Sequence, residues 1–271
     1  MNIKFSVILP IYWKNEFSDF KKTFKSIVSQ SLRPNEIIII FDGKVNSEIK
    51  KFINKSKKKY KIKILKNTKN LGLGKSLNKC IKFCKNEIIA RVDCDDINYP
   101  NRFKNQIRTL LKNNLDLVGS STLEYNSGSK TKLIKSNPIK NDKIKKYLKF
   151  KNSINHQTVI FKKKSVLLSG NYEHVPFFED YFLWVKMAKN NFKFGNLNKI
   201  LVKAKIDGDF YHRRSGKKYF LNYYYFLKKC LKVKYINRIE FFILLFFRGL
   251  IYSFSEKIIK FFYISFLRKK F

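Results

Sequence analysis

The first half of the chain alternates short apolar runs with segments of helical periodicity. The run EIIIIF at residues 36–41 is apolar on both faces, which is typical of a strand in the middle of a sheet. In the helical segments, apolar residues recur every three or four positions; the clearest stripe is Phe17, Phe20, Phe24, Ile27 and Val28. The expected strands span residues 3–9, 36–41, 60–65, 87–92 and 115–123. This order predicts an α/β fold with a mostly parallel, Rossmann-like sheet flanked by helices.

Two more helices are expected in this half, and the pattern then changes. One helix has the inward stripe Leu73, Leu77, Ile81 and Cys84, and Pro100 opens the other as its first residue. Beyond residue 123 the strict alternation stops, with a strand expected at 158–161 and a helix at 180–189. The second half is therefore expected to be α+β.

From about residue 217 the chain consists of aromatic-rich helical segments with basic faces. Residues 241–247 are nearly all apolar, but Arg248 ends the run well short of the roughly 20 residues that span a bilayer. In the last segment, residues 258, 259, 262, 263 and 266 place an apolar stripe opposite basic residues, which is typical of a helix lying in a membrane interface. The alternative is that these helices pack on the rest of the chain or on a second subunit, as in a homodimer.

Charge and cysteine content add two constraints. A formal net charge of +40 predicts attraction for polyanions such as nucleic acid, anionic lipid or a sugar nucleotide. Lys, Asn, Ile, Phe and Tyr are abundant together and all have A/T-rich codons, so the charge does not single out nucleic acid. The four cysteines show no CxxC pair and no disulfide-scaffold density, which predicts a reducing compartment. The apolar start is short and interrupted by Pro10, so the N-terminus is expected to stay in the cytosol.

The most informative polar cluster is Asp93-Cys94-Asp95-Asp96, directly after a predicted buried strand. Open α/β sheets bind ligands at the carboxyl ends of their strands. Three carboxylates in four residues repel one another, and a hard divalent cation bridging phosphate oxygens would compensate them. The cluster therefore indicates a Mg²⁺ or Mn²⁺ diphosphate site. The alternative is a solvated acidic turn whose Asp residues cap the next helix.

Two other segments also reach the ligand edge of the predicted sheet. Asp42 ends the central strand and is suited to accept hydrogen bonds from a base or ribose, although it could also be a turn residue before Gly43. The segment NLGLGKSLN at residues 70–78 lacks the spacing of a phosphate-binding P-loop. As a glycine-rich loop that enters a helix, it can still present backbone N–H groups to a nucleotide.

Candidate residues in the second half lie mainly in the segment FFEDY. An apolar neighbourhood raises the pKa of Glu179 or Asp180 toward the range of a general base, although a helix N-terminus opposes this and either residue could simply be a cap. His156 is more typical of a packed core histidine than of a catalyst. Arg213 and Arg214 either clamp a phosphate or are solvated charges.

Several of these stretches, in this order and spacing, resemble family 2 glycosyltransferases, and more closely the bacterial amylovoran, exopolysaccharide and O-antigen glycosyltransferases. The resemblance covers nearly the whole chain up to the tail. The matching stretches are SVILPIY (6–12), PNEIIIIFDG (34–43), NLGLGKSLN (70–78), ARVDCDD (90–96), NHQTVIFKKKSVLLSGNY (155–172), FFEDYFLWVKM (177–187) and YHRRSGKKY (211–219).

The resemblance implies a GT-A fold, a role for each matching residue and a donor substrate. Asp95 would be the main ligand of Mn²⁺ or Mg²⁺ in a DxD element supported by Asp96, and Asp180 would be the general base of an inverting transfer from a UDP-sugar. Asp42 would contact the uracil-ribose part and Asp93 the ribose, sugar or metal. The other donor-binding residues implied are Pro10, Tyr12, Asn70, Gly72, Lys75 and Arg91. Two positions depart from the family pattern, because Phe41 precedes Asp42 where many relatives have a second acid, and Lys205 replaces an expected Arg.

The implied organisation is one catalytic domain with a tail. Residues 1–130 would form the nucleotide-sugar half, 131–216 the half that holds the acceptor and the base, and 217–271 an amphipathic membrane-associating tail. The acceptor would be a lipid-linked oligosaccharide, and the enzyme would lie on anionic lipid at the cytoplasmic face of the membrane, without a specific nucleic-acid partner. A nucleic-acid-binding protein leaves the acidic clusters unexplained, and a sugar-nucleotide pyrophosphorylase would need its glycine-rich loop after the first strand, where Pro10-Ile11-Tyr12 stands.

Overall fold

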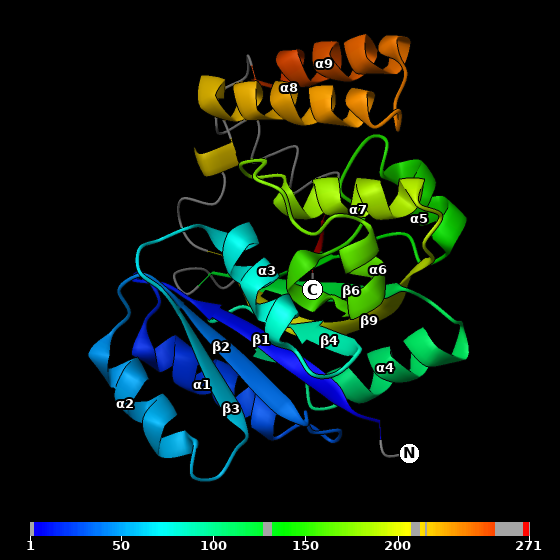
Figure 1. Ribbon diagram of the computed structural model, residues 1–271. Helices are drawn as coiled ribbons and strands as arrows, with labels where there is room; N and C mark the ends of the chain where they lie inside the picture. Colours follow the sequence, from blue (N-terminus) through cyan, green and yellow to red (C-terminus); the bar gives the residue numbers. More distant parts are fainter. Residues whose placement is uncertain (1–2, 127–131, 207–211, 215, 253–267, 271) are drawn as a thin grey trace.

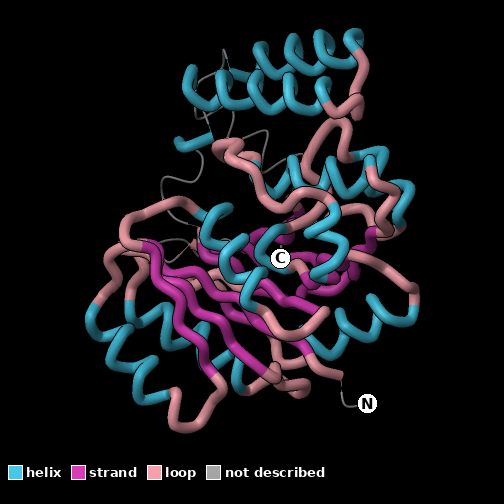
Figure 2. The backbone as a smooth tube through the Cα atoms, in the orientation of Figure 1, coloured by secondary structure: helices cyan, strands magenta, loops and turns pink. Residues whose placement is uncertain are grey.

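The computed structural model describes residues 3–126, 132–206, 212–214, 216–252 and 268–270. In the described chain, one central sheet is covered by helices on both faces (Figures 1 and 2). The strands are β1 (Phe5–Ile11), β2 (Glu36–Asp42), β3 (Ile62–Asn67), β4 (Ile88–Arg91), β5 (Ile97–Asn98), β6 (Leu117–Tyr125), β7 (Lys132–Lys135), β8 (Ile160–Lys162), β9 (Phe194–Lys205) and β10 (Lys269–Lys270). The helices are α1 (Phe17–Val28), α2 (Ser47–Ser56), α3 (Leu73–Phe83), α4 (Arg102–Lys112), α5 (Asn141–Tyr147), α6 (Lys163–Leu168), α7 (Glu179–Lys189), α8 (Gly216–Lys232) and α9 (Arg238–Tyr252), with short 3-10 turns at His156–Thr158 and His212–Arg214.

The first four long strands form the parallel part of the sheet, in the order β3-β2-β1-β4. β2 is buried at every position, as its uniformly apolar run predicts. Its side chains alternate between two cores: Ile38 and Ile40 pack with the inner side of α3, and Ile37 and Ile39 pack with α1 and α2. All three strands β1, β2 and β4 therefore end at the same edge of the sheet.

The second half continues the sheet in mixed orientation. β8 runs antiparallel to both β4 and β6, while β9 runs parallel to β6 from Leu117↔Phe194 to Tyr125↔Lys205 with a local register shift. The sequence pattern did not predict β9, because the polar segment around Asn198 and Lys199 interrupts its apolar run. The mixed α/β architecture expected from the sequence is confirmed.

Two details of the expected helices are wrong. Leu73 does not face the core: its side chain is 37% exposed at the start of α3. α4 begins at Arg102 with Asn101 as its N-cap, so Pro100 lies just before the helix instead of opening it. α3 does start at Leu73, where the first turn is still partly exposed, whereas α4 starts two residues later than the proline position predicts.

Helices α8 and α9 form an antiparallel pair beyond α7, at the far end of the molecule from α1 and α2 (Figure 1). α8 packs on α7 through aromatic side chains, with the Phe226 ring stacked on Phe178 at 5.1 Å and close to Tyr181 at 4.5 Å. α9 packs on α8 and leaves much of its own apolar surface open, with Phe242 and Phe246 66% and 64% exposed. Within the described residues, no helix is both long and apolar enough to cross a membrane.

The C-terminal end of the chain returns to the sheet. β10 pairs antiparallel with β7, in the register Lys269↔Ile134 and Lys270↔Leu133. The preceding Arg268 forms a buried ion pair with Glu124 of β6. The apolar stripe expected at residues 258–266 lies outside the described residues. The segment from residue 217 onward thus contacts the rest of the described chain through α8, through β10 and through the Lys149–Glu240 ion pair to α9.

Candidate active site

Most of the residues predicted to bind the donor surround one cavity at the carboxyl edge of the parallel strands. Its volume is about 850 Å³. Among its lining residues are the predicted Pro10, Tyr12, Asp42, Asn70, Gly72, Arg91, Asp93, Asp95, Asp96 and Arg214. Lys75 is exposed and lines neither this cavity nor the one next to it. The strand ends and the loops that follow them therefore gather residues from far apart in the sequence.

Asp42 organises the glycine-rich loop. Its Oδ1 accepts hydrogen bonds from Leu71 N (2.8 Å) and Asn67 Nδ2 (2.9 Å), and its Oδ2 accepts one from Gly72 N (3.0 Å). The next residue, Gly43, has φ +82°, and a Cβ there would come within 2.9 Å of the Asn70 backbone nitrogen. The carboxylate thus fixes the loop beside the cavity, in addition to lining it.

The acidic loop after β4 is tied to its neighbours by backbone and side-chain bonds. Thr23 of α1 donates from its hydroxyl to the carbonyl oxygens of Cys94 (2.9 Å) and Asp96 (2.8 Å). Asp96 is only 4% exposed, and its Oδ1 accepts a hydrogen bond from the Lys205 backbone N–H at the end of β9 (3.0 Å). Asp96 therefore holds the loop against β9, and Asp95 presents the more accessible carboxylate.

Burial and mutual repulsion raise the pKa values of two carboxyl groups in this loop. Burial raises the pKa of Asp95 to about 6, and the neighbouring Asp93 carboxylate adds to the effect. Burial likewise raises the pKa of Asp96 well above its usual range, with Asp93 and Asp95 contributing. A divalent cation bound here would reverse these shifts, because it would stabilise the ionised carboxylates.

The donor set suits a hard cation that is shared with a substrate. No group of three or more His, Cys, Asp or Glu side chains converges as a complete metal site within the described part of the chain. Mg²⁺ and similar ions are commonly held by one or two carboxylates together with substrate phosphate oxygens. Asp95 and Asp93 therefore fit a cation whose remaining ligands come from a diphosphate.

Arg91 is the cationic side chain at the centre of the site. It is 3% exposed and forms an ion pair with Asp93 through Nη2. Its Nε and Nη1 atoms are buried without a hydrogen-bond partner among the described residues. Unpaired buried donors of a guanidinium are costly, and an anionic ligand would satisfy them. No sequence pattern indicates these free donors, because they depend on how the side chain is enclosed.

A second cavity, of about 390 Å³, contains the predicted base. The Asp180 Oδ2 atom accepts a hydrogen bond of 2.8 Å from Asn152 Nδ2. Burial raises the pKa of Asp180, and the Asn152 hydrogen bond opposes that shift. Burial raises the pKa of the adjacent Glu179 to about 7, with the Asp180 charge adding to it. Both carboxyl groups are thus shifted toward the range in which a side chain can exchange protons near neutral pH.

The two cavities adjoin. Arg91 and Asp93 line both of them, as do Leu73, Glu124, Gln157 and Arg214. The acidic loop after β4 and the FFEDY segment therefore line neighbouring cavities on the same side of the molecule. The roles predicted for the two acidic motifs require them to lie close together. Only the tertiary fold brings them together, because they are more than 80 residues apart in the sequence.

His156 lies in the wall of the second cavity as a packed histidine. Its Nε2 atom is 2.9 Å from the Tyr172 hydroxyl oxygen, and its ring lies edge-on to Trp184. Burial lowers the pKa of the imidazole well below its ordinary value, so the ring stays neutral near pH 7. Arg214 lines both cavities, whereas the side chain of Arg213 lies outside the described residues.

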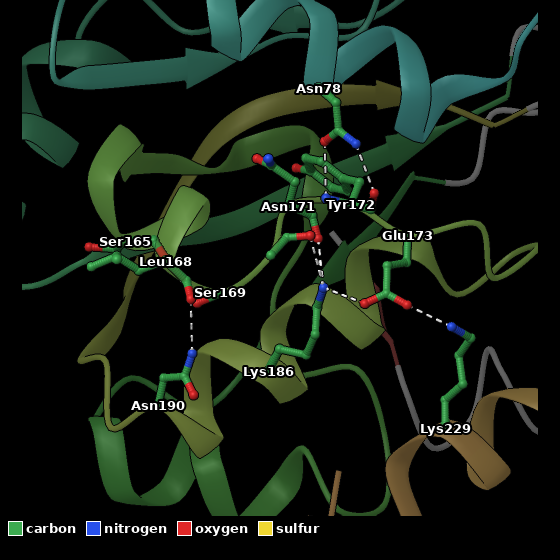
Figure 3. Close-up of polar contacts among 11 residues, drawn as sticks. Asn78, Ser165, Leu168, Ser169, Asn171, Tyr172, Glu173, Lys186, Asn190 and Lys229 are labelled. Carbon is green, nitrogen blue, oxygen red and sulfur yellow. Dashed lines mark hydrogen bonds and ion pairs between the residues drawn. The ribbon is translucent and has the colours of Figure 1, made fainter. Parts of the chain in front are cut away.

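The loop that leads into α7 is held by a polar network (Figure 3). Lys186 of α7 donates to the carbonyl oxygens of Gly170 (3.2 Å) and Asn171 (2.9 Å) and to Glu173 Oε1 (2.8 Å). Lys229 of α8 donates to the other Glu173 oxygen at 2.6 Å. At the loop's other side, Asn78 of α3 exchanges two hydrogen bonds with the Tyr172 backbone. The network ties residues 170–173 of this loop to the second half of α7, to α3 and to α8.

Several residues of the site carry no signal in the sequence. Glu124, Lys135 and Asn152 all line the second cavity, yet none belongs to a recognisable motif. Glu124 is the residue that a sequence pattern comes closest to indicating, since it is an acidic residue near the end of a buried strand. The others can be found only from the packing of loops against the sheet.

The mixed α/β fold, with adjoining cavities at the carboxyl edge of its parallel strands, is similar to that of the GT-A glycosyltransferases, and comparison with known proteins gives the family. Residues 6–168 match the model of glycosyl transferase family 2. The chain therefore belongs to family 2 of the glycosyltransferases, and the resemblance seen in the sequence is confirmed. This assignment also favours a transferase over a pyrophosphorylase or a nucleic-acid-binding protein.

Individual relatives extend the match beyond the family segment. The chain is 32% identical over 216 residues to the amylovoran biosynthesis glycosyltransferase AmsE of Erwinia amylovora, covering 79% of this chain and 81% of that protein. It is 36% identical over 219 residues to the UDP-Gal:alpha-D-GlcNAc-diphosphoundecaprenol beta-1,3-galactosyltransferase of Escherichia coli, covering 80% and 79%.

Solved structures support the fold. TarS of S. aureus, residues 1–349 in complex with UDP-GlcNAc, is similar with a TM-score of 0.67 at 18% identity, over 94% of this chain and 74% of that one. The mannosyltransferase PcManGT from Pyrobaculum calidifontis, in complex with GDP-Man and Mn²⁺, has a TM-score of 0.61 at 14% identity, over 89% and 68%.

Proposed function

We propose that this glycosyltransferase moves a hexose or N-acetylhexosamine from a UDP-sugar to a saccharide carried on a lipid diphosphate, with inversion at the anomeric carbon, during synthesis of a bacterial surface polysaccharide. The observation that supports this most directly is that the two cavities adjoin and share Arg91 and Asp93. The donor would occupy the larger cavity and the acceptor the smaller one. The names of the bacterial relatives support the substrate classes.

The larger cavity suits a nucleoside diphosphate. Its glycine-rich side presents the loop that Asp42 holds, and its acidic side presents Asp95. In this proposal Asp95 would hold Mn²⁺ or Mg²⁺ together with the donor's diphosphate, with Asp93 beside it. The bound cation would neutralise the charge that develops on the leaving diphosphate. Arg91 would donate its unpaired Nε and Nη1 hydrogens to an anionic oxygen of the donor.

Asp180 is the proposed general base. The acceptor hydroxyl oxygen bonds to the anomeric carbon on the face opposite the diphosphate, the bond from that carbon to the diphosphate oxygen breaks, and the hydroxyl proton passes to Asp180. Asn152 orients the carboxylate and keeps part of its negative charge stabilised. The network around Glu173 and Lys186 ties the loop before α7 to α7 itself and to α8, which limits the reorganisation needed during the reaction.

The central test is a donor panel with released UDP as the readout, run with and without Mn²⁺ in the presence of a saccharide-diphospholipid acceptor mixture. Asp180→Asn is expected to abolish transfer while UDP binding stays near the wild-type value, and Asp95→Asn is expected to remove the Mn²⁺ dependence of UDP binding. Asp142→Asn, at an exposed position of α5, is the matched control. Wild-type turnover of Asp180→Asn, together with loss of turnover in Glu179→Gln, would assign the base to Glu179 instead.

We also propose that the enzyme binds anionic lipid at the cytoplasmic face of the membrane through α9. Phe242 and Phe246 project from one side of this helix and are largely exposed, and the chain carries a large excess of positive charge. All four cysteines are free and buried, which is compatible with a reducing compartment.

Vesicle sedimentation tests this location. The double variant Phe242→Ser and Phe246→Ser is expected to lose most binding to vesicles that contain anionic lipid, because two large apolar side chains no longer enter the interface. Leu168→Ser, at a position 63% exposed on α6, is the control. Point substitutions are preferable to deletion of the tail, because deletion would also remove Arg268 and leave Glu124 buried without its ion pair. Equal recovery of the double variant and the wild type with vesicles would refute the role of α9.

A further inference from the structure

The smaller cavity carries more positive charge than the carboxylates around it balance. Cationic side chains outnumber carboxylates six to four among its lining residues. Two of the carboxylates are already engaged, Asp93 with Arg91 and Glu124 with Arg268. Four cationic side chains remain, and three of them are Lys135, Lys151 and Arg248. These three residues and Arg268 are called the basic cluster below.

The two lysines of the basic cluster are held near other positive charge. Neither ammonium group has a hydrogen bond or ion pair with any residue that the structure describes, and Lys151 lies over the Tyr147 ring at 5.1 Å. Burial lowers the pKa of Lys135 to about 8, and the Arg268 guanidinium adds to the effect. The pKa of Lys151 is lowered by the same two causes. Cations brought together in a cavity in this way would be stabilised by a multivalent anion.

Four separate segments supply the basic cluster. Lys135 ends β7, Lys151 follows α5, Arg248 lies on α9 and Arg268 precedes β10. Arg268 makes two contacts with the buried Glu124, which fix its guanidinium in place. It is therefore a positioning residue that adds positive potential, and the two lysines are the side chains free to contact a ligand.

Helix α9 links this cavity to an apolar surface. Arg248 lines the cavity from the same helix face as the buried Leu244 and Phe241, whereas Phe242 and Phe246 are exposed on the other side. A helix is about 10 Å across with its side chains. An anion at the basic cluster would thus lie roughly one helix diameter from a surface suited to a lipid chain.

We propose that the basic cluster binds the diphosphate group of the lipid-linked acceptor, so that the tail completes the acceptor site. This inference rests on the proposed function, because it assumes that the donor diphosphate occupies the other cavity at Asp95. It adds a specific requirement: the acceptor is recognised through the diphosphate next to its first sugar, as well as through the sugar. A free alkyl glycoside of the same saccharide would lack that contact.

Calorimetry with geranyl diphosphate as the probe tests the proposal on the full chain saturated with UDP and Mn²⁺. The probe is expected to bind, inorganic pyrophosphate to bind more weakly, and geraniol not to bind. Lys135→Gln and Lys151→Gln are each expected to weaken binding of the probe about tenfold or more, the effect of losing a hydrogen bond to a charged group. Lys132→Gln, an exposed lysine on the same strand as Lys135, is expected to bind as the wild type does. UDP affinity is expected to be unchanged in all three variants.

No binding of geranyl diphosphate to the UDP-saturated protein would overturn the proposal, and so would wild-type binding by the double variant Lys135→Gln and Lys151→Gln. Pyrophosphate that binds as tightly as geranyl diphosphate would show a site for free phosphates and overturn the lipid assignment. Failure of UDP to bind would instead contradict the proposed function, and the probe could then still be titrated without UDP. Thermal unfolding of each variant shows whether a loss of binding comes from loss of the fold.

Discussion

Replacing Asn152 should change the pH at which this enzyme works. The Asn152 Nδ2 atom donates a 2.8 Å hydrogen bond to Asp180 Oδ2 in a buried setting, and it favours the ionised carboxylate. Asn152→Leu removes that donor and keeps a side chain of similar volume. Because the ionised form loses stabilisation, the pKa of Asp180 rises. A hydrogen bond to a charged group contributes about 1.5–3 kcal/mol, which corresponds to a rise of roughly one to two pH units in the acid limb of kcat/KM.

The assay is the pH dependence of UDP release at saturating donor. A base must be ionised to accept the proton, so the variant is expected to lose most activity at low pH and to recover toward the wild-type rate as the pH increases. Asn190→Leu is the matched control, since the Asn190 side chain donates to the Leu168 carbonyl at an exposed position just after α7. An unchanged acid limb in an otherwise active Asn152→Leu enzyme would show that Asp180 does not govern that limb. A limb displaced to lower pH would contradict the sign of the argument.

Two further predictions concern stability and the donor loop. Gly43→Ala forces a side chain into φ +82° against the Asn70 backbone nitrogen, and should weaken UDP binding and cost on the order of 1–3 kcal/mol in unfolding free energy; unchanged UDP affinity by calorimetry would contradict it. Phe226→Ala removes a ring that is 2% exposed between α7 and α8, and should cost about 3–5 kcal/mol by denaturant unfolding, whereas Leu221→Ala at a 53% exposed position of α8 should change little. Equal effects of these two substitutions would mean that α8 does not pack on α7 in solution.

The parallel half of the sheet follows from local sequence pattern. The run at residues 36–41 is apolar at every position, and a strand with no polar face is stable only between two layers of helices. The apolar stripe of α1 and the apolar runs of the strands before and after it each identify one element, so the strand–helix–strand order can be predicted from local sequence. The acidic loop after β4 also follows, because the end of a central parallel strand is where such sheets bind ligands.

The second half could not be read in the same way. β9 extends over 12 residues, and the polar positions in its middle are exposed where its register with β6 shifts. Pairing with β6, and not the periodicity of its own sequence, makes this segment a strand. Arg268 meets Glu124 across 144 residues of sequence, and nothing near either residue predicts the contact. Asn152 and Asp180 are likewise brought together only by the packing of α7 against the loop after α5.

The sequence by itself therefore determined the family, the fold class and the two acidic motifs, because these depend on short-range patterns and on residues close together in the chain. Only the tertiary structure decided that both motifs line adjoining cavities, which of Asp95 and Asp96 is the more accessible, and that the tail returns an arginine to the site. Those features depend on long-range packing, in which burial and the distance between charges are set by segments that have no sequence relation to one another.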